Sequence, residues 1–307
     1  MRLNQNNLNK LITESLAIEA EEAREAGTIG YMARALVQAT MPHKNPGQVE
    51  AWGRRNGDFS MVMQPGYTMN KSNELCNVGL PYGTKPRLVM SFISSEAIKT
   101  RNHEIILGRS LSEFMRQLDL TPTGGRWGTI PLLKDQMKRL FSATVSFQYN
   151  DQSIDASGGF KIASRTLLFW DTKSTNQSAL WESTVILTQE FYKEIIDRPV
   201  PLDMRALSAL KGSSLALDIY CWLTYRMSYI KKKTLIPWVA LEAQFGSDYN
   251  ETRYFKRKFL DQLRAVLVVY PEAKIEDGGS CLVLSPSKTH IQRQPVAQNI
   301  IINQSVP

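Results

Sequence analysis

The stretch ETRYFKRKFLDQLRAVLVVYP, residues 251–271, starts with a dense group of cations and then becomes almost wholly apolar. On a helix with roughly 100° per residue, the apolar residues share one side, which comprises Phe255, Phe259, Leu263, Val266, Leu267 and Tyr270. The opposite side carries Arg253, Arg257 and Arg264, with Lys256 at its flank. A helix of this kind buries one face and exposes a cationic one. Solvated helix surfaces are often charged, so the cations alone do not indicate a binding site. The segments around this helix are needed to interpret them.

The segments around the helix follow a definite order. After it, AKIE (273–276) and SCLVLS (280–285) are joined by the tight turn Asp277-Gly278-Gly279, which predicts a β-hairpin. Before it, we predict helices over residues 203–211 and 214–230, a strand at TLIP (234–237) and a helix at PWVALEAQFG (237–246).

A second basic helix is predicted over residues 131–142, PLLKDQMKRLFS. Its two sides separate as before, into the apolar Leu133, Met137, Leu140 and Phe141 and the basic Lys134, Lys138 and Arg139. We predict helices ahead of it over 86–99 and 108–120, the latter opened by a capping box of Ser110 and Glu113. After it, TVSFQY (144–149) and FKIASRTLLFW (160–170) predict a second hairpin.

Helices followed by a basic helix and a hairpin therefore occur twice. This order is typical of the winged helix, in which the basic third helix enters the major groove of DNA and the hairpin, or wing, lies along the backbone. We expect an α+β fold of tandem winged-helix domains, each a helical bundle with a β-hairpin wing, preceded by a helical N-terminal arm. The expected ranges are 1–60 for the arm, 61–180 and 181–290 for the domains and 291–307 for a flexible tail. Within the arm, residues 8–39 look helical, with an interruption at Gly27 to Gly30 as the alternative.

The composition of the 307 residues fits a soluble protein with an anionic partner. The formal net charge is +8, and the positive excess lies after residue 60. No apolar run approaches the ~18 residues of a membrane span, and the first residues lack the apolar core of a signal peptide. We therefore expect a cytoplasmic protein without membrane contact. Three cysteines stand far apart and indicate neither a disulfide framework nor a thiolate metal site: Cys76, Cys221 and Cys281.

Several long stretches resemble one known family. They are YMARALVQATMPHK (31–44), WGRRNGDFSM (52–61), GLPYGTKPRLV (79–89), GRSLSEFMRQLDLTPTGGRWGTIPLLKDQMKRLFSATVSF (108–147) and ALDIYCWLTYRMSYIKKKTLIPWVALEAQFGSDYNETRYFKRKFLDQLRAVLVVYP (216–271). These are similar to the RepA-type replication initiators of bacterial plasmids, and the resemblance covers about residues 28–290.

The resemblance implies a protein that binds repeated sites in double-stranded DNA, called iterons, at a plasmid origin. Such a protein helps open the adjacent AT-rich duplex and brings in the host replication initiator and the replicative helicase. It also implies homodimer and monomer forms. By the same resemblance, the C-terminal winged helix is the main reader of the repeat, and the N-terminal one serves dimerisation and auxiliary DNA contact.

Two kinds of DNA contact can be assigned to these basic residues. The planar fork of arginine binds guanine O6 and N7 together, which makes Arg253 and Arg257 candidates for base readout. The remaining cations of the two basic helices suit the DNA backbone: Lys256, Lys258, Arg264, Lys134, Lys138 and Arg139.

Two loops leave alternatives open. Lys231, Lys232 and Lys233 lie between a predicted helix and strand, where they form either a solubilising turn or a phosphate clamp. The loop TPTGGRWGT (121–129) is either plain glycine turn chemistry or an anion site made by free N–H groups and Arg126.

Nothing in the sequence favours catalysis or a cofactor. The histidines His43, His103 and His290 are isolated, and no cluster has metal-ligand spacing. We therefore expect a binding protein that is not an enzyme, with no cofactor and no metal. Its main alternative role is that of a sequence-specific transcriptional repressor without a replication function, and an RNA-binding regulator is a second competitor. Tandem direct repeats would favour the initiator, whereas an inverted repeat would favour a dimeric repressor.

Overall fold

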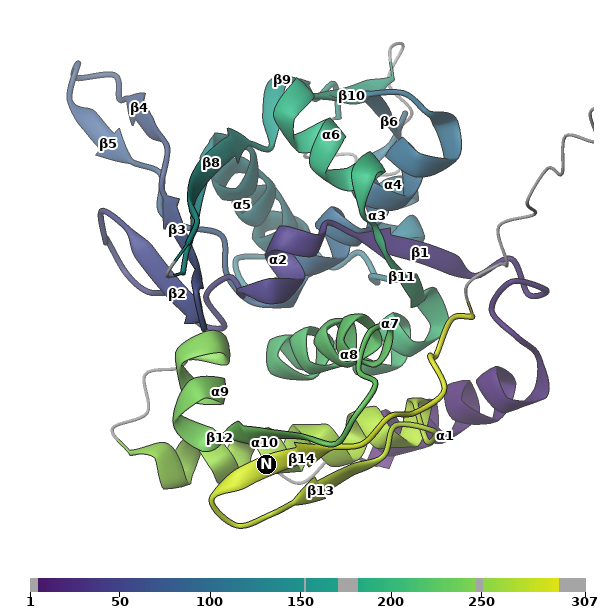
Figure 1. The fold of residues 1–307 in the computed structure, drawn as a ribbon. Helices are drawn as coiled ribbons and strands as arrows, with labels where there is room; N and C mark the ends of the chain where they lie inside the picture. Colours follow the sequence, from purple (N-terminus) through teal and green to yellow (C-terminus); the bar gives the residue numbers. More distant parts are fainter. Residues whose placement is uncertain (1–4, 152, 171–181, 247–250, 293–307) are drawn as a thin grey trace, which may run out of the picture.

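The protein, described here by a computed structural model over residues 5–151, 153–170, 182–246 and 251–292, mixes helices and strands (Figure 1). The helices of these ranges are α1 (Gln5–Ala20), α2 (Arg34–Gln38), α3 (Thr84–Thr100), α4 (Leu111–Gln117), α5 (Thr129–Ser142), α6 (Gln189–Asp197), α7 (Met204–Leu210), α8 (Ser214–Met227), α9 (Trp238–Phe245) and α10 (Thr252–Val269). The strands are β1 (Ile29–Met32), β2 (Trp52–Asn56), β3 (Phe59–Gln64), β4 (Tyr67–Met69), β5 (Leu75–Asn77), β6 (Glu104–Gly108), β7 (Thr144–Asn150), β8 (Asp155–Lys161), β9 (Ala163–Leu167), β10 (Ser183–Leu187), β11 (Val200–Asp203), β12 (Thr234–Pro237), β13 (Ile275–Asp277) and β14 (Cys281–Leu284).

The strands pair in small antiparallel sheets rather than in one large sheet. The sheet orders are β2-β3-β7-β8, β6-β10-β9 and β12-β14-β13, and two further pairs are β1-β11 and β4-β5. The buried apolar side chains, from Leu11 of α1 to Leu284 of β14, form one contiguous cluster across these sheets and the helices between them. In Figure 1, α8 lies near the middle of the molecule, with α5 above it and α10 below it.

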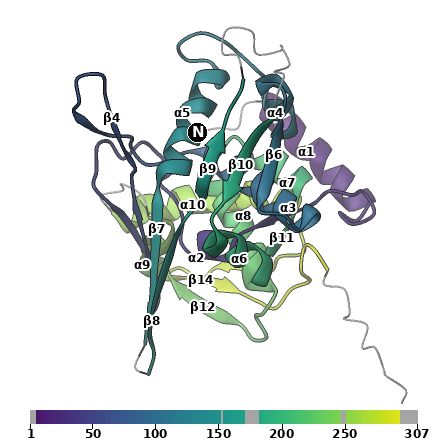
Figure 2. The same cartoon turned by 90° about the horizontal axis from the view of Figure 1, so that it is seen from above.

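Two stretches of the chain have the same connectivity. The first runs α3, β6, α4, α5, β9 and β10, with β7 and β8 inserted between α5 and β9. The second runs α8, β12, α9, α10, β13 and β14 without an insertion. Their sheets have the same order, because β6-β10-β9 and β12-β14-β13 both place the last strand between the other two, as Figure 2 shows for β10. We call these stretches the first and second repeat units. In each unit the third helix is one of the basic helices found in the sequence.

The hairpin that belongs to the first repeat unit is not the one predicted. Residues 144–149 pair with β8, from Thr144 opposite Lys161 to Asn150 opposite Asp155, and β7 also pairs with β3. The predicted strand 160–170 is divided, since β9 leaves this sheet and pairs with β10. The sequence pattern continues from β8 into β9 and so does not show where one strand ends and the next begins. Strands β9 and β10 are also far apart in the sequence. A turn signal in the sequence does not detect such a hairpin.

The expected helix over residues 8–39 is broken, and the break extends beyond the interruption expected at Gly27 to Gly30, because helix resumes only at Arg34. Helix α1 ends at Ala20, and β1 then pairs with β11, with Ile29 opposite Asp203. Gly30 allows this pairing to pack closely, because a Cβ atom there would lie 2.2 Å from the Met204 Sδ. Gly27 adopts a φ of +66°, which glycine accepts without strain.

Two expected domain boundaries fall inside sheets. The boundary at residues 60/61 cuts β3, and the boundary at 180/181 separates β9 from β10, which pair with each other. Helix α6 packs against α3 and β8, so it also belongs with the first unit. The expected tail, 291–307, lies outside the described residues except for Ile291, which is buried, and Gln292.

The first helices of the two repeat units are joined by a buried ion pair. Arg87 of α3 donates two hydrogen bonds of 2.7 Å to the carboxylate of Asp218 on α8. The His43 Nε2 lies 2.7 Å from the same carboxylate. Burial opposes ionisation of Asp218, but the charge of Arg87 and the hydrogen bonds from His43 and Arg87 outweigh it and lower the Asp218 pKa. Burial also lowers the pKa of His43, so the imidazole is neutral near pH 7.

Candidate nucleic-acid interface

Helix α10 has the two faces that its sequence predicts. Its apolar side enters an aromatic cluster in which Phe259 lies 5.3 Å from Phe245 and 5.7 Å from Trp238, measured between ring centroids. The buried side chains of the helix include Phe255, Phe259, Leu263 and Val266, and Tyr270 is buried just beyond its end. Leu267 is partly buried against the same core. This anchoring fixes which side of α10 faces the solvent.

The exposed side of α10 presents arginines near its first turn and further along. The side chain of Arg253 is 69% exposed and pairs with Glu251 at 2.7 Å. Arg257, one turn further, is exposed, and its guanidinium lies 5.6 Å from the centre of the Tyr254 ring. Arg264 is 76% exposed and pairs with Asp261 at 2.9 Å. Exposed ion pairs of this kind contribute little stability, about 0–1 kcal/mol, so both arginines remain available to an anionic partner.

Lys256 is engaged with the hairpin of its own unit. Its Nζ lies 2.8 Å from the Asp277 carboxylate and donates to the Gly279 carbonyl at 2.7 Å, both in the β13–β14 turn. The Trp238 indole N–H donates to the same carbonyl at 3.1 Å. The hydrogen bond from Lys256 lowers the pKa of Asp277. These contacts fix the tip of the hairpin against α9 and α10, so in this structure Lys256 positions the hairpin.

Helix α5 offers two unengaged lysines and one arginine that is turned inward. Lys134 and Lys138 are exposed, and neither forms a hydrogen bond or ion pair with another described residue. Arg139, by contrast, is only 15% exposed and pairs with Asp135 at 2.8 Å. Gly79 leaves space for it, because a Cβ atom at Gly79 would lie 2.2 Å from the Arg139 Nη1. Arg139 therefore joins α5 to the segment that carries Gly79.

The loop before α5 has a fixed conformation. The Thr123 and Thr129 side chains each accept a 2.9 Å hydrogen bond from the backbone N–H of the other residue. Gly125 has a φ of +79°, the positive value that glycine turn chemistry involves. The loop presents Trp127, which is 81% exposed, with the Arg126 guanidinium 5.2 Å from the centre of its ring. No hydrogen bond or ion pair links Arg126 to another described residue.

The remaining predicted cations lie around the second repeat unit. Lys231, Lys232 and Lys233 are exposed in the turn between α8 and β12. Lys258 is partly exposed on α10. The predicted residues do not converge on one patch, since α8 separates α5 from α10 in Figure 1. They form two basic surfaces, one for each repeat unit.

Two arginines beside the second unit were missed by the sequence analysis. Strand β2 packs against α9, and the Arg54 side chain donates to the Gly246 carbonyl at 2.8 Å. Arg55 follows on the same strand and is exposed. The motif WGRRNG contains both, but their position beside α9 depends on packing between segments far apart in the sequence.

Two further kinds of site, a metal cluster and a membrane-spanning helix, were sought among the described residues. Among them, no group of three or more His, Cys, Asp or Glu side chains is placed to hold a metal ion. None of their helices combines the length and apolarity that crossing a bilayer requires.

The fold and its basic helices define a mixed helix-and-strand protein with two surfaces suited to an anionic partner. A family profile described as plasmid encoded RepA protein matches residues 80–239. The chain belongs to this family, as its motifs predicted, and has a role in the initiation of plasmid replication. Membership implies DNA binding.

One solved structure with a TM-score above 0.5 supports the fold. The crystal structure of a selenomethionine derivative of domains 2 and 3 of RctB aligns with a TM-score of 0.51 at 10% identity, covering 82% of this chain and 95% of that one. A second crystal structure of RctB domains 2–3 aligns with a TM-score of 0.48 at 9% identity, covering 83% and 96%. A comparison with curated protein sequences gave no match.

Proposed function

We propose that this RepA-family chain initiates replication by binding iterons at a plasmid origin through two winged-helix units. The observation that carries the proposal is the repeated connectivity, in which each unit places a basic helix third and closes its sheet with the same strand order. A helix suits the major groove when its inner face is anchored and its outer face is cationic. Helix α10 combines both features, and its adjoining hairpin is held in place by Lys256.

The second unit is the main reader in this proposal. Recognition helices contact base edges with residues near their N-terminus, and Arg253 and Arg257 lie in the first turns of α10. Lys258 and the turn containing Lys231, Lys232 and Lys233 supply backbone contacts. In the first unit, Lys134 and Lys138 of α5 add contacts that are independent of sequence, together with Arg126.

The chain acts in this proposal as a binding protein and not as an enzyme. Binding to repeated sites helps open the adjacent AT-rich duplex and recruits the host replication initiator and the replicative helicase. The protein exchanges between a homodimer and the monomer that binds the repeats.

Footprinting of the purified protein on DNA flanking its own gene tests this function. Two salt concentrations separate attraction to phosphate from recognition of a site, because phosphate contacts weaken steeply with salt. Protection of evenly spaced direct repeats beside an AT-rich tract is the expected result. A lone inverted repeat over the promoter would identify a repressor. Preference for single-stranded RNA loops would identify an RNA-binding regulator, and no selective protection would exclude both DNA-binding functions.

A further inference from the structure

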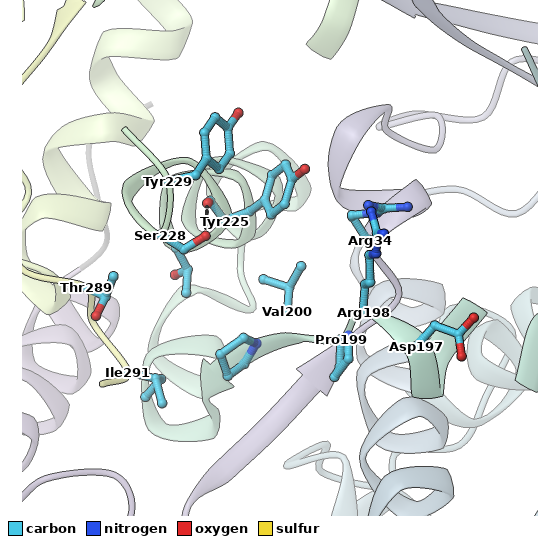
Figure 3. Close-up of a pocket in the computed structure, with 12 residues that line it drawn as sticks. Arg34, Asp197, Arg198, Pro199, Val200, Tyr225, Ser228, Tyr229, Thr289 and Ile291 are labelled. Carbon is cyan, nitrogen blue, oxygen red and sulfur yellow. Dashed lines mark hydrogen bonds between the residues drawn. The ribbon is translucent and has the colours of Figure 1, made fainter. Parts of the chain in front are cut away.

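A cavity of about 500 Å³ opens where the two repeat units meet, and none of the predicted DNA-binding residues line it. Its walls come from the start of α2, the connection from α6 to β11, the end of α8 and the segment around Thr289. Figure 3 shows its charged side, with Arg34 and Arg198 next to each other, and its aromatic side, with Tyr225 and Tyr229 on α8 and just after it. The floor between the two sides is apolar and consists of Pro199, Val200 and Pro201.

The two cavity arginines have no polar partner among the described residues. Neither Arg34 nor Arg198 forms a hydrogen bond or ion pair with another described residue. The Arg34 Nε is buried without a hydrogen-bond partner. A buried guanidinium donor without an acceptor is costly, so Arg34 retains unused hydrogen-bonding capacity among the described residues. The Glu194 carboxylate, which lies nearby, accepts instead from the Ala35 backbone N–H at 2.9 Å.

The aromatic side is fixed rather than loose. The rings of Tyr225 and Tyr229 lie 5.1 Å apart in an edge-to-face arrangement. Arg226 donates to the Tyr229 hydroxyl at 2.7 Å and lies 5.4 Å from the centre of its ring. These contacts hold one wall as an aromatic surface that faces the arginines.

We propose that this cavity binds a nucleoside phosphate. Guanidinium groups hold phosphate oxygens with paired, charge-assisted hydrogen bonds, and Arg34 and Arg198 are placed to share one phosphate group. A nucleobase suits the opposite wall, where it can pack against the tyrosine rings above the proline floor. None of the residues assigned to DNA lines the cavity, although the turn with Lys231 begins two residues after Tyr229. The inference does not rest on the proposed function.

Isothermal titration calorimetry of the full chain with ATP and GTP tests the proposal, with inorganic phosphate and pyrophosphate as probes of a simple anion site. Arg34→Gln and Arg198→Gln should each weaken nucleotide binding about tenfold or more, because each removes a charge-assisted contact. Arg165→Gln is the matched control, since Arg165 is an exposed arginine on β9 away from the cavity, and it should change binding less than about twofold. The variants should stay folded, because neither cavity arginine has a hydrogen-bond or ion-pair partner among the residues that the structure describes.

Thermal unfolding supplies a second readout. A nucleotide that binds the folded chain raises its unfolding midpoint, and this rise should disappear in Arg34→Gln. The proposal is overturned if the wild-type chain binds neither nucleotide at millimolar concentration, if pyrophosphate binds as tightly as ATP, or if Arg165→Gln loses as much as the cavity variants. Footprints on origin DNA without nucleotide should be the same for Arg34→Gln and the wild type, so failure here leaves the DNA-binding function untouched.

Discussion

The two repeat units share one connectivity but use their basic helices differently. In the second unit, the hairpin turn is short and tied to α10 by Lys256, and Arg253 and Arg257 remain on the surface. In the first unit, Arg139 is turned inward beside Gly79, and only lysines are left on the exposed face of α5. Lysine is a point charge without the planar fork that reads guanine. We therefore expect the second unit to select a sequence and the first to add affinity, in line with the proposed function.

The largest expected effect comes from breaking the buried ion pair between Arg87 and Asp218, which joins the two units. Asp218→Asn leaves Arg87, which is 3% exposed, without its carboxylate, and breaking a buried ion pair costs about 3–5 kcal/mol. Urea unfolding measured by circular dichroism should show this loss. The exposed pair of Lys99 and Glu96 is the matched control, and Lys99→Met should cost at most about 0.5 kcal/mol. An Asp218→Asn chain as stable as the wild type would mean that the units do not depend on this pair.

Arg257→Ala should have the next largest effect. Loss of a bidentate base contact costs about 1–3 kcal/mol of iteron binding and relaxes the preference at one base. Fluorescence anisotropy with iteron DNA and scrambled DNA of the same length measures both. Arg264→Ala, further along the same face, is the control and should weaken both DNAs similarly. Equal losses on both DNAs for Arg257→Ala would remove its base-reading role.

Asp277→Asn separates two roles of Lys256. If Lys256 positions the hairpin, this change loosens the turn. The free-energy difference between iteron and scrambled DNA binding should then shrink by up to about 1 kcal/mol, the value of a typical hydrogen bond. Were Lys256 a phosphate ligand held back by Asp277, the same change would release it. Binding to both DNAs would then strengthen together. Competition binding with the two DNAs distinguishes these results.

The same contrast explains what the sequence could predict. Local signals were sufficient for α10, whose apolar spacing lies within one helix, and for the start of α4, where the Ser110 Oγ accepts from the Glu113 N–H at 3.1 Å. Contacts between segments far apart in the chain could not be predicted from the sequence. The pairing of β1 with β11 joins residues about 170 positions apart, and Arg139 was assigned to phosphate because its neighbour Gly79 lies far away in sequence. The cavity arginines Arg34 and Arg198 were missed for the same reason, since only the fold brings them together.

Replacing Lys134 and Lys138 by alanine should weaken DNA binding without changing its selectivity. Each lysine that contacts phosphate contributes about one to the slope of log affinity against log salt, so the double variant should lower the slope by about two. Anisotropy titrations at several salt concentrations measure this slope. Arg139→Ala on the same helix should affect folding stability instead, because Arg139 faces inward. A change in the iteron preference of the lysine variant would assign sequence reading to the first unit as well.

The smallest expected effect is a pH dependence of folding stability that comes from two buried histidines. Burial lowers the pKa of His43, which contacts Asp218. Burial also lowers the pKa of His290, which lies 2.8 Å from the Tyr220 hydroxyl. As pH falls through the ordinary histidine value of about 6.5, the unfolded chain takes up protons that the folded chain refuses, so stability present above that pH is lost. Urea midpoints between pH 7.5 and 5.5 should fall, and less steeply in His43→Gln. Because His290 remains, the slope left in that variant reports the second unit alone. A midpoint that rises on acidification would contradict both buried neutral histidines.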